Sequence, residues 1–421
     1  MDVIQLVLML FVLLLLSNIG SFVAKKLHLP GMIGEIIFGI IAANLVISQL
    51  GDWNLLEQIG IIIAGPGEAG SEGYRVLMLL AELGVIFLLF TVGLETKVSD
   101  LKKVGKPAIF SAILGMIVPF IAGFAINALF GGDIMASLFI ATALMTTSAG
   151  IAAHILKKLD VYDSKEGKII LGAAIISEIT TLVTFAVMAS LSGGDTSTTG
   201  VALTLLKALG FVVVAFLIVI FVMPTIHKWI FRNLQDPRSD WATLFIGVAF
   251  CFSTALIANQ MGLSVIIGAY LAGMMFADKA KDWHMIREVE PLKEFFMSFF
   301  FTSVGMRVVM SDLGNMEVLT FAIALSIVAV LSKYIACGIG AKIGDKTLDY
   351  TSTNIIGWGM VPKAEVVMVI AATGVMTGVL SSTVFTCIVV TAIVTTMVSH
   401  FMAERGFRKK YGEDLSVAVD V

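Results

Sequence analysis

The chain has 421 residues, of which 58% are hydrophobic and 14% are charged, and its mean hydropathy is +0.98. A water-soluble protein carries about 25% charged residues, so this composition excludes a soluble globular protein and indicates a chain that crosses a membrane many times. The net charge of −3 gives no basic excess for a nucleic-acid partner. The three cysteines all lie in apolar runs, which argues against a disulfide framework.

Apolar segments long enough to cross a bilayer recur along the whole chain. The first, which begins at Val3, is too long for the hydrophobic part of a signal peptide and is predicted to be a span. An apolar run between residues 51 and 73 is too short to cross and is predicted to lie at the interface. We predict thirteen helical spans: 3–24, 31–50, 74–95, 106–130, 134–156, 168–192, 200–230, 240–260, 262–278, 291–310, 315–340, 350–374 and 379–403.

Basic residues gather in alternate loops, which hold most of the 28 lysines and arginines. Loops rich in Lys and Arg stay in the cytoplasm. We therefore expect the N-terminus outside and the C-terminus in the cytoplasm of a protein that crosses the plasma membrane. An odd number of spans independently requires the two termini to lie on opposite sides.

Two short segments of the first half recur in the second half. Glycines five residues apart at Gly34 and Gly39 are echoed at Gly268 and Gly273, and Phe90–Leu94 is echoed by Phe301–Met306. An odd linker span would invert the second repeat, and inverted repeats are typical of secondary transporters. We therefore divide the chain into a first six-helix repeat (1–195), a linker with helix 7 (196–238), a second six-helix repeat (239–405) and a cytoplasmic tail (406–421).

One carboxylate lies near the middle of an apolar span. Glu178 follows Ser177 in the span 168–192, at a depth where an ionisable group is costly and marks a functional site. A neutral Glu178 that is hydrogen-bonded to a neighbouring helix is the structural alternative. Lys333, midway along the span 315–340, is the second buried charge, and its alternative is to extend towards an interface.

Two spans in corresponding positions of the halves are interrupted. In the span 134–156, a run of small and polar residues includes Thr147 and Ser148. Matching interruptions in two repeats are a sequence indication of a transport site, and hydroxyl oxygens suit hard cations. The alternative is a face of small residues for helix packing.

The span 350–374 is interrupted by Pro362, which removes an internal helix donor. Lys363 and Glu365 follow it within an otherwise apolar span. They are predicted either to neutralise helix ends at the break or to contact the transported ion. A packing face alone does not explain these two charges.

The chain resembles the monovalent cation:proton antiporters, in the branch of bacterial and archaeal sodium/proton antiporters and Kef-type potassium efflux systems. The resemblance covers all thirteen spans and rests on Leu83–Glu95, Ala143–Ile151, Ile170–Glu178, Lys333 and Gly359–Glu365. It implies an all-α polytopic membrane protein with two inverted six-helix repeats, whose fifth and twelfth spans cross as broken helices. It also implies that spans 4–6 and 11–13 form a moving core, and that the other spans form the dimerisation domain of a homodimer.

The chain departs from that family at one position. The electrogenic members that it resembles carry two adjacent aspartates on span 6, where this chain has Ser177 and Glu178. In those members the first acid pairs with the lysine of span 11. Lys333 has therefore lost this partner, and we expect it to deprotonate or to reach Glu178. A Glu178–Lys333 pair would favour electroneutral one-for-one exchange.

These patterns predict an antiporter without cofactor and not an enzyme, since no phosphate loop, HExxH motif or nucleophile elbow occurs. It would exchange a monovalent cation, Na⁺ first with Li⁺ or K⁺ as alternatives, for protons in pH homeostasis. Cation and proton would compete for Glu178 by alternating access, with Ser177, Thr147 and Ser148 as further ligands. Membrane lipids are the other partners. An organic-anion/sodium symporter of related fold and a Kef-like gated potassium efflux unit are the alternatives.

Overall fold

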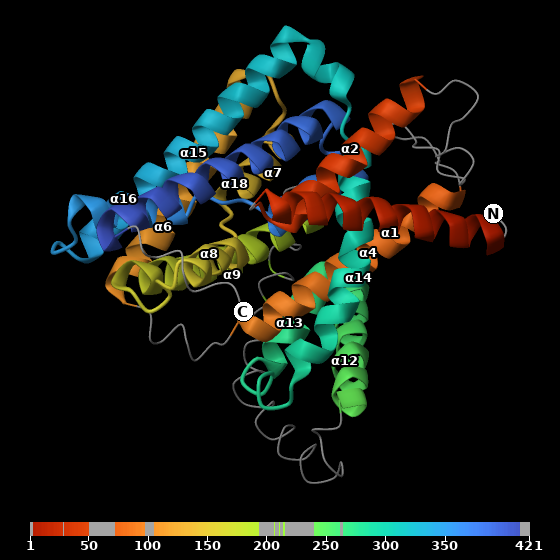
Figure 1. The fold of residues 1–421 in the computed structure, drawn as a ribbon, viewed down its shortest axis with the longest axis horizontal. Coiled ribbons are helices and arrows are strands. Elements are labelled where there is room, and N and C mark those ends of the chain that lie inside the picture. The colour runs from red at the N-terminus through yellow and green to blue at the C-terminus, as the bar shows by residue number, and fades with distance from the viewer. Residues whose placement is uncertain are drawn as a thin grey trace. The chain divides into compact units, whose positions relative to one another are not determined.

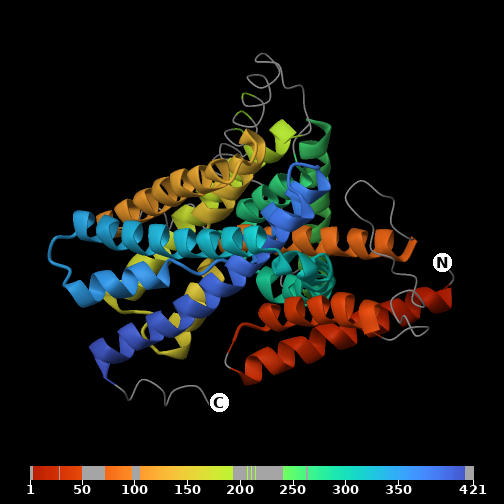
Figure 2. The same cartoon turned by 90° about the horizontal axis from the view of Figure 1, so that it is seen from above.

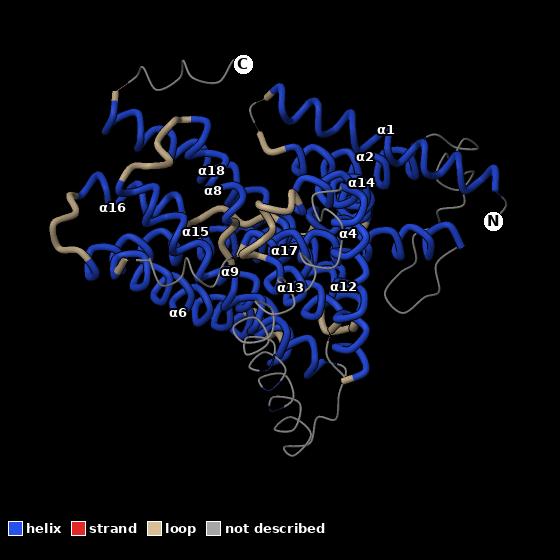
Figure 3. Tube along the Cα trace, turned by 90° about the horizontal axis from the view of Figure 1, so that it is seen from below, coloured by secondary structure: helices blue, strands red, loops and turns tan. Residues whose placement is uncertain are grey.

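The computed structural model describes residues 3–27, 29–49, 72–96, 105–192, 240–261 and 264–412, with 206, 210 and 214 as isolated positions. Within these residues the chain forms helices joined by short connections (Figure 3). The expected span 200–230 and nearly all of the expected interfacial segment 51–73 lie outside the described residues.

Eight helical segments of the described residues are long and apolar enough to cross a membrane, and one of them, Ile134–Lys158, is a pair of shorter helices separated by a break. Three shorter apolar segments accompany them: Gly31–Ala43, which is the first part of the helix Gly31–Gln49, and the helices Val265–Phe276 and Glu365–Met376. Helices satisfy their own backbone hydrogen bonds, which lipid cannot do for them. The all-helical fold that we expected is therefore confirmed for the described part of the chain.

The helices divide into two compact units. Unit 1 comprises Met1–Asp100 and Ala186–Arg307, and unit 2 comprises Leu101–Phe185 and Val308–Val421. Unit 2 thus contains the expected spans 4, 5, 11, 12 and 13 and most of span 6, which is close to the moving core that the family resemblance implied.

Unit 1 is built on contacts between helices from the two halves of the chain. The helix α4 packs against α13 and α14, and α2 packs against α14. The first two helices, both red, lie side by side (Figures 1 and 2). The helices are α1 (Val3–Lys26), α2 (Gly31–Gln49), α4 (Glu72–Glu95), α12 (Asp240–Gln260), α13 (Val265–Phe276) and α14 (Met285–Met306).

Four of the glycines in the repeated segments allow close backbone contacts within unit 1. A Cβ on Gly39 would lie 3.1 Å from the Cα of Gly305, and a Cβ on Gly93 would lie 2.9 Å from the Cα of Gly273. Each glycine thus meets a glycine from the other half of the chain. In both contacts, the first repeated segment of one half packs against the second repeated segment of the other half. Such close backbone approach requires glycine.

Unit 2 contains two pairs of short helices, α7 with α8 and α16 with α17, and each pair takes the place of one continuous span. The helix α15 lies along α6 (Figures 1 and 2) and also contacts α16 and α18, while α7 packs against α6 and α17. The helices are α6 (Lys106–Leu129), α7 (Ile134–Met145), α8 (Ala149–Lys158), α9 (Lys165–Ser192, whose last residues belong to unit 1), α15 (Met316–Gly344), α16 (Tyr350–Gly359), α17 (Glu365–Met376) and α18 (Ser382–Tyr411).

Polar side chains fix where four helices of unit 2 begin. The side chains of Asp133, Ser148, Asp349 and Ser381 each accept a backbone N–H from the first turn of α7, α8, α16 and α18, respectively. A cap of this kind stabilises a helix by about 1 kcal/mol. Local sequence therefore sets where α7, α8 and α16 begin. The fourth helix of the broken spans, α17, has no side-chain cap.

The ends of α9, α16 and α18 are joined by one buried carboxylate. Glu166 accepts hydrogen bonds from Lys410 (2.7 Å), Ser352 (2.6 Å) and Tyr411 (2.6 Å). The helix α18 accordingly continues to Tyr411, through residues that we had assigned to a tail.

Replacing Gly273 by alanine tests the close packing of unit 1. The new Cβ would lie 2.0 Å from the carbonyl oxygen of Phe90, so α4 and α13 must separate. We expect Gly273→Ala to cost about 1–3 kcal/mol, measured as a lower thermal unfolding midpoint in detergent. Gly247→Ala on α12 is the matched control, because its Cβ meets nothing closer than 3.4 Å. Equal midpoints for the two variants would contradict the packing described above.

Candidate functional site

Two helices of unit 2 break where the sequence predicted. The helix α7 ends at Met145 and α8 begins at Ala149, with Thr146–Ser148 non-helical between them. The helix α16 ends at Gly359 and α17 begins at Glu365. All residues of both breaks are buried. Each break exposes helix-end carbonyl and amide groups that need partners inside the protein.

The two breaks provide partners for each other. The amide of Ser148 donates to the carbonyl of Pro362 at 2.9 Å. The hydroxyl of Thr147 donates to the carbonyl of Met360, just past the end of α16, at 3.1 Å. The interrupted segments therefore touch through their backbones, so Thr147, Ser148 and Pro362 are brought together.

Lys363 supplies a positive charge where α7 ends. Its side chain is 1% exposed, and its ammonium donates to the carbonyls of Leu144 and, at 3.0 Å, Thr146. The carbonyl end of a helix carries a partial negative charge, which a cation stabilises. The hydroxyl of Thr396 on α18 donates to the carbonyl of Lys363 at 2.6 Å, which ties α18 to the break.

Glu365 supplies a negative charge where α17 begins. The hydroxyl of Ser148 donates to its carboxylate at 3.3 Å and accepts from the amide of Ile151 in the first turn of α8. Glu365 thus lies in the first turn of α17 and contacts the cap of α8, and helix N-termini attract negative charge. Lys363 and Glu365 together match the partial charges of three of the four helix ends.

Lys333 is fully buried on α15 and has three oxygen acceptors. Its ammonium donates to the carbonyl of Gly115 at 2.7 Å, the carbonyl of Met145 at 2.6 Å and the hydroxyl of Ser177 at 3.4 Å. An ammonium has three N–H donors, so each has an acceptor. Ser177 stands where the family resemblance implied an acidic partner for Lys333, and it contacts Lys333 through a neutral hydroxyl.

The carbonyl of Gly115 is available because of a proline that sequence reasoning missed. Pro119 lies inside α6, four residues after Gly115, and has no N–H to donate to that carbonyl. Lys333 from α15 takes this acceptor instead. A proline within an apolar span is visible in the sequence. Its effect on Lys333 depends on the packing of α15 along α6, which the sequence alone does not show.

The helix α9 presents the acidic residue and two hydroxyls. Ser177 is fully buried and donates to the carbonyl of Met145 at 3.1 Å, while Glu178 is partly exposed. Thr181, three residues after Glu178, shares its helix face. The Thr181 hydroxyl is fully buried and finds no hydrogen-bond partner within the described residues, and Thr181 is not among the candidates predicted from the sequence.

The arrangement offers oxygen ligands beside fixed charges. Within the described residues, no group of three or more His, Cys, Asp and Glu could hold a metal ion. Hydroxyl and carboxylate oxygens suit a hard cation that is bound and released.

Removing the Lys363 ammonium tests whether the break depends on it. Lys363→Met keeps the apolar stem but leaves the carbonyls of Leu144 and Thr146 without their donor. We expect a loss of about 2 kcal/mol or more, seen as a lower thermal unfolding midpoint. Lys157→Met at the exposed end of α8 is the control and should leave the midpoint unchanged. If both variants unfold together with the wild type, Lys363 does not stabilise the crossing.

Comparison with known proteins gives a consistent result. A model of the family described as "Sodium/hydrogen exchanger, transmembrane" matches residues 10–404. The chain is 29% identical to the Na⁺/H⁺-K⁺ antiporter GerN of Bacillus cereus, over 94% of this chain and 95% of that protein. It is 31% identical to the high-affinity Na⁺/H⁺ antiporter NhaS3 of Synechocystis sp., over 86% and 81%.

The fold has a solved counterpart. The structure of the sodium proton antiporter MjNhaP1 from Methanocaldococcus jannaschii at pH 8 matches with a TM-score of 0.66, covering 96% of this chain and 97% of that one at 15% identity. The family match extends over nearly the whole chain, including both broken spans and the helix that carries Glu178. The chain is therefore a multi-pass membrane protein that belongs to the sodium/hydrogen exchanger family, a cation/proton antiporter.

Proposed function

We propose that this antiporter exchanges a monovalent cation, Na⁺ first and Li⁺ or K⁺ as alternatives, for protons by alternating access, with both ions competing for Glu178. The observation that carries the proposal is the pair of crossed breaks in unit 2, next to the helix that bears this carboxylate. Lys363 and Glu365 already match the helix ends at the breaks. Glu178, near the middle of the neighbouring helix α9, is the carboxylate that we propose exchanges the ions.

The proposed cation ligands are oxygens near Glu178. The hydroxyls of Thr147 and Ser148 donate their protons to the carbonyl of Met360 and the carboxylate of Glu365, respectively. Each hydroxyl oxygen keeps a lone pair that could bind a cation. Ser177 is the weakest ligand of those that we expected, because its oxygen faces the Lys333 ammonium. Thr181 is added as a ligand, because its buried hydroxyl would gain a partner when a cation binds.

Lys333 is proposed to remain a fixed positive charge through the cycle. Its three acceptors stabilise the charged form without requiring Glu178. The protonated site then holds neutral Glu178 and Lys333⁺, and the cation-loaded site holds Glu178⁻, the cation and Lys333⁺. Both loaded states carry the same charge, so the proposed exchange is one-for-one and moves no net charge.

The cellular setting follows from the sequence argument. We place the antiporter in the plasma membrane with the N-terminus outside and the C-terminus in the cytoplasm, because its basic loops lie on one side. A homodimer and a role in pH homeostasis complete the proposal. The Kef-like alternative is weaker, because GerN and NhaS3, which match over most of their own length, are both named as antiporters of Na⁺ and H⁺.

Replacing Glu178 by glutamine is the direct test of the shared site. Gln keeps the shape but binds neither a proton nor a cation as a carboxylate does, so cation-dependent proton release from proteoliposomes should fall to background. Glu178→Asp keeps the carboxylate and should retain measurable exchange. Wild-type rates in the glutamine variant would exclude Glu178 as the ion-binding group.

Replacing Pro119 by alanine tests how Lys333 is positioned. The new N–H of residue 119 competes for the carbonyl of Gly115 that Lys333 now uses. We expect slower exchange without loss of thermal stability, because alanine is the better helix former. Exchange kinetics identical to the wild type would show that this carbonyl does not position Lys333 for transport.

Electroneutrality is tested by the response to voltage. Proteoliposomes with a fixed pH gradient receive an imposed potassium-diffusion potential, with Na⁺ or Li⁺ as the transported ion. The proposed one-for-one exchange gives the same rate at every potential. A rate that follows the membrane potential would require a second proton or a second charged group in the cycle.

A further inference from the structure

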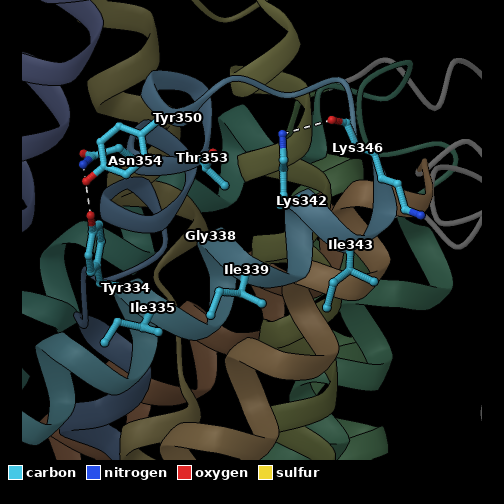
Figure 4. Close-up of a pocket in the computed structure, with 10 residues that line it drawn as sticks. All are labelled: Tyr334, Ile335, Gly338, Ile339, Lys342, Ile343, Lys346, Tyr350, Thr353 and Asn354. Atoms are coloured by element: carbon cyan, nitrogen blue, oxygen red, sulfur yellow. Dashed lines mark hydrogen bonds between the residues drawn. The ribbon is translucent and has the colours of Figure 1, made fainter.

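A groove of about 630 Å³ lies on the surface of unit 2, between α15 and the start of α16 (Figure 4). Apolar side chains of α15, including Ile335, Ile339 and Ile343, form one side. The other side is formed by residues of α16 such as Tyr350. None of these residues takes part in the crossed breaks.

The apolar side of the groove belongs to a longer ridge on α15. Residues at every fourth position of this helix share one face, and here each is large, apolar and about half exposed. They are Ile323, Ile327, Leu331, Ile335, Ile339 and Ile343, with exposures between 47% and 52%. In a membrane-spanning helix such a ridge faces hydrocarbon chains.

The length of the groove matches one leaflet. From Tyr334 to Gly344 the helix α15 rises about 15 Å, which is half of the roughly 30 Å hydrocarbon core of a bilayer. At the inner end, the Tyr334 hydroxyl accepts from the amide of Asn354 at 2.9 Å, and its ring stacks on Trp358 at 4.5 Å. The groove is therefore closed by satisfied polar groups at one end and is open along its apolar side.

The other end of the groove is basic. Lys342 donates to the carbonyls of Lys346 and Leu348, which holds the turn after α15 in place (Figure 4). Neither Lys342 nor Lys346 forms an ion pair with another part of the described chain. Tyr350, which is 81% exposed, lies at the inner end of the groove, beside Tyr334 and Asn354 (Figure 4).

The two nearby carboxylates are already used. Asp345 pairs with Lys165 at 2.7 Å, and this contact together with Thr347 holds the pKa of its carboxyl well below the usual range. Asp349 caps α16 by accepting hydrogen bonds from Ser352, and these bonds lower the pKa of the Asp349 carboxyl to about 2. The Asp349 carboxylate also lies 3.4 Å from the Lys410 ammonium. The positive charge of the groove end is therefore left for another partner.

We propose that this groove binds one anionic glycerophospholipid, with an acyl chain along Ile335, Ile339 and Ile343 and the phosphate beside Lys346 and Lys342. A lysine at the end of a lipid-facing groove attracts an anionic head group, and the apolar side suits an acyl chain, which a soluble inorganic anion lacks. In the proposed orientation, the lipid comes from the cytoplasmic leaflet. The inference does not depend on which cation is transported.

Quenching by brominated lipids locates the bound lipid. Trp358 stacks on a side chain of the groove, and a variant that retains only this tryptophan is made by changing Trp53, Trp229, Trp241 and Trp283 to phenylalanine. The full chain is placed in vesicles of phosphatidylcholine mixed with dibrominated phosphatidylglycerol or dibrominated phosphatidylcholine. We expect the anionic lipid to occupy the groove about fivefold more favourably than the neutral one.

Lys346→Gln in the same background should remove most of this fivefold preference, whereas Lys157→Gln, on an exposed lysine outside the groove, should keep it. Equal quenching by the two brominated lipids, or an unchanged preference in Lys346→Gln, would overturn the proposal. Native mass spectrometry of the chain with all its tryptophans gives the second measurement. There, Lys346→Gln should bind phosphatidylglycerol about fivefold more weakly than Lys157→Gln, and equal binding would again overturn it.

Discussion

A helix that stops inside an apolar medium leaves backbone carbonyls and amides that lipid cannot satisfy, and the organisation of unit 2 depends on how these groups find partners. The break after α7 and the break after α16 are bonded to each other through Ser148 and Pro362. Lys363 meets the carbonyl end of α7, and Glu365 contacts the cap of α8. Without these side chains, two buried interruptions of a helix would leave their backbone groups unsatisfied and would be too costly to keep. With them, unit 2 can hold irregular backbone where an ion site is proposed.

The same physical requirement explains Lys333. A buried ammonium needs its donors satisfied, and α6 provides one acceptor because Pro119 leaves the carbonyl of Gly115 without a helical donor. In the proposed mechanism Lys333 is then a fixed charge, whereas Glu178 changes its partner. The serine at position 177 is consistent with this division, because it offers Lys333 a hydroxyl that does not titrate at physiological pH.

Hydropathy predicted the described helices because a membrane span needs a long apolar run. The exact ends were less predictable: α14 begins at Met285, six residues before the apolar run that we had identified, because its first turns are charged. Both breaks were visible as polar or proline-containing interruptions, and their crossing came from the family resemblance. The acceptors of Lys333 could not be predicted, since two of them are backbone carbonyls whose availability depends on which helices pack together. Thr181 was equally hidden, because a threonine within an apolar helix usually bonds to its own backbone.

The central claim is that one carboxylate binds either a cation or a proton. The most direct measurement is the apparent KM for Na⁺ as a function of pH, from initial isotopic Na⁺ uptake into vesicles with equal pH on both sides. Competition at a single site predicts that the KM rises about tenfold for each unit by which the pH falls below the pKa of the site, while the maximal rate stays constant. An apparent KM that does not change with pH while the maximal rate falls would mean that proton and cation bind at separate groups, and would contradict the account.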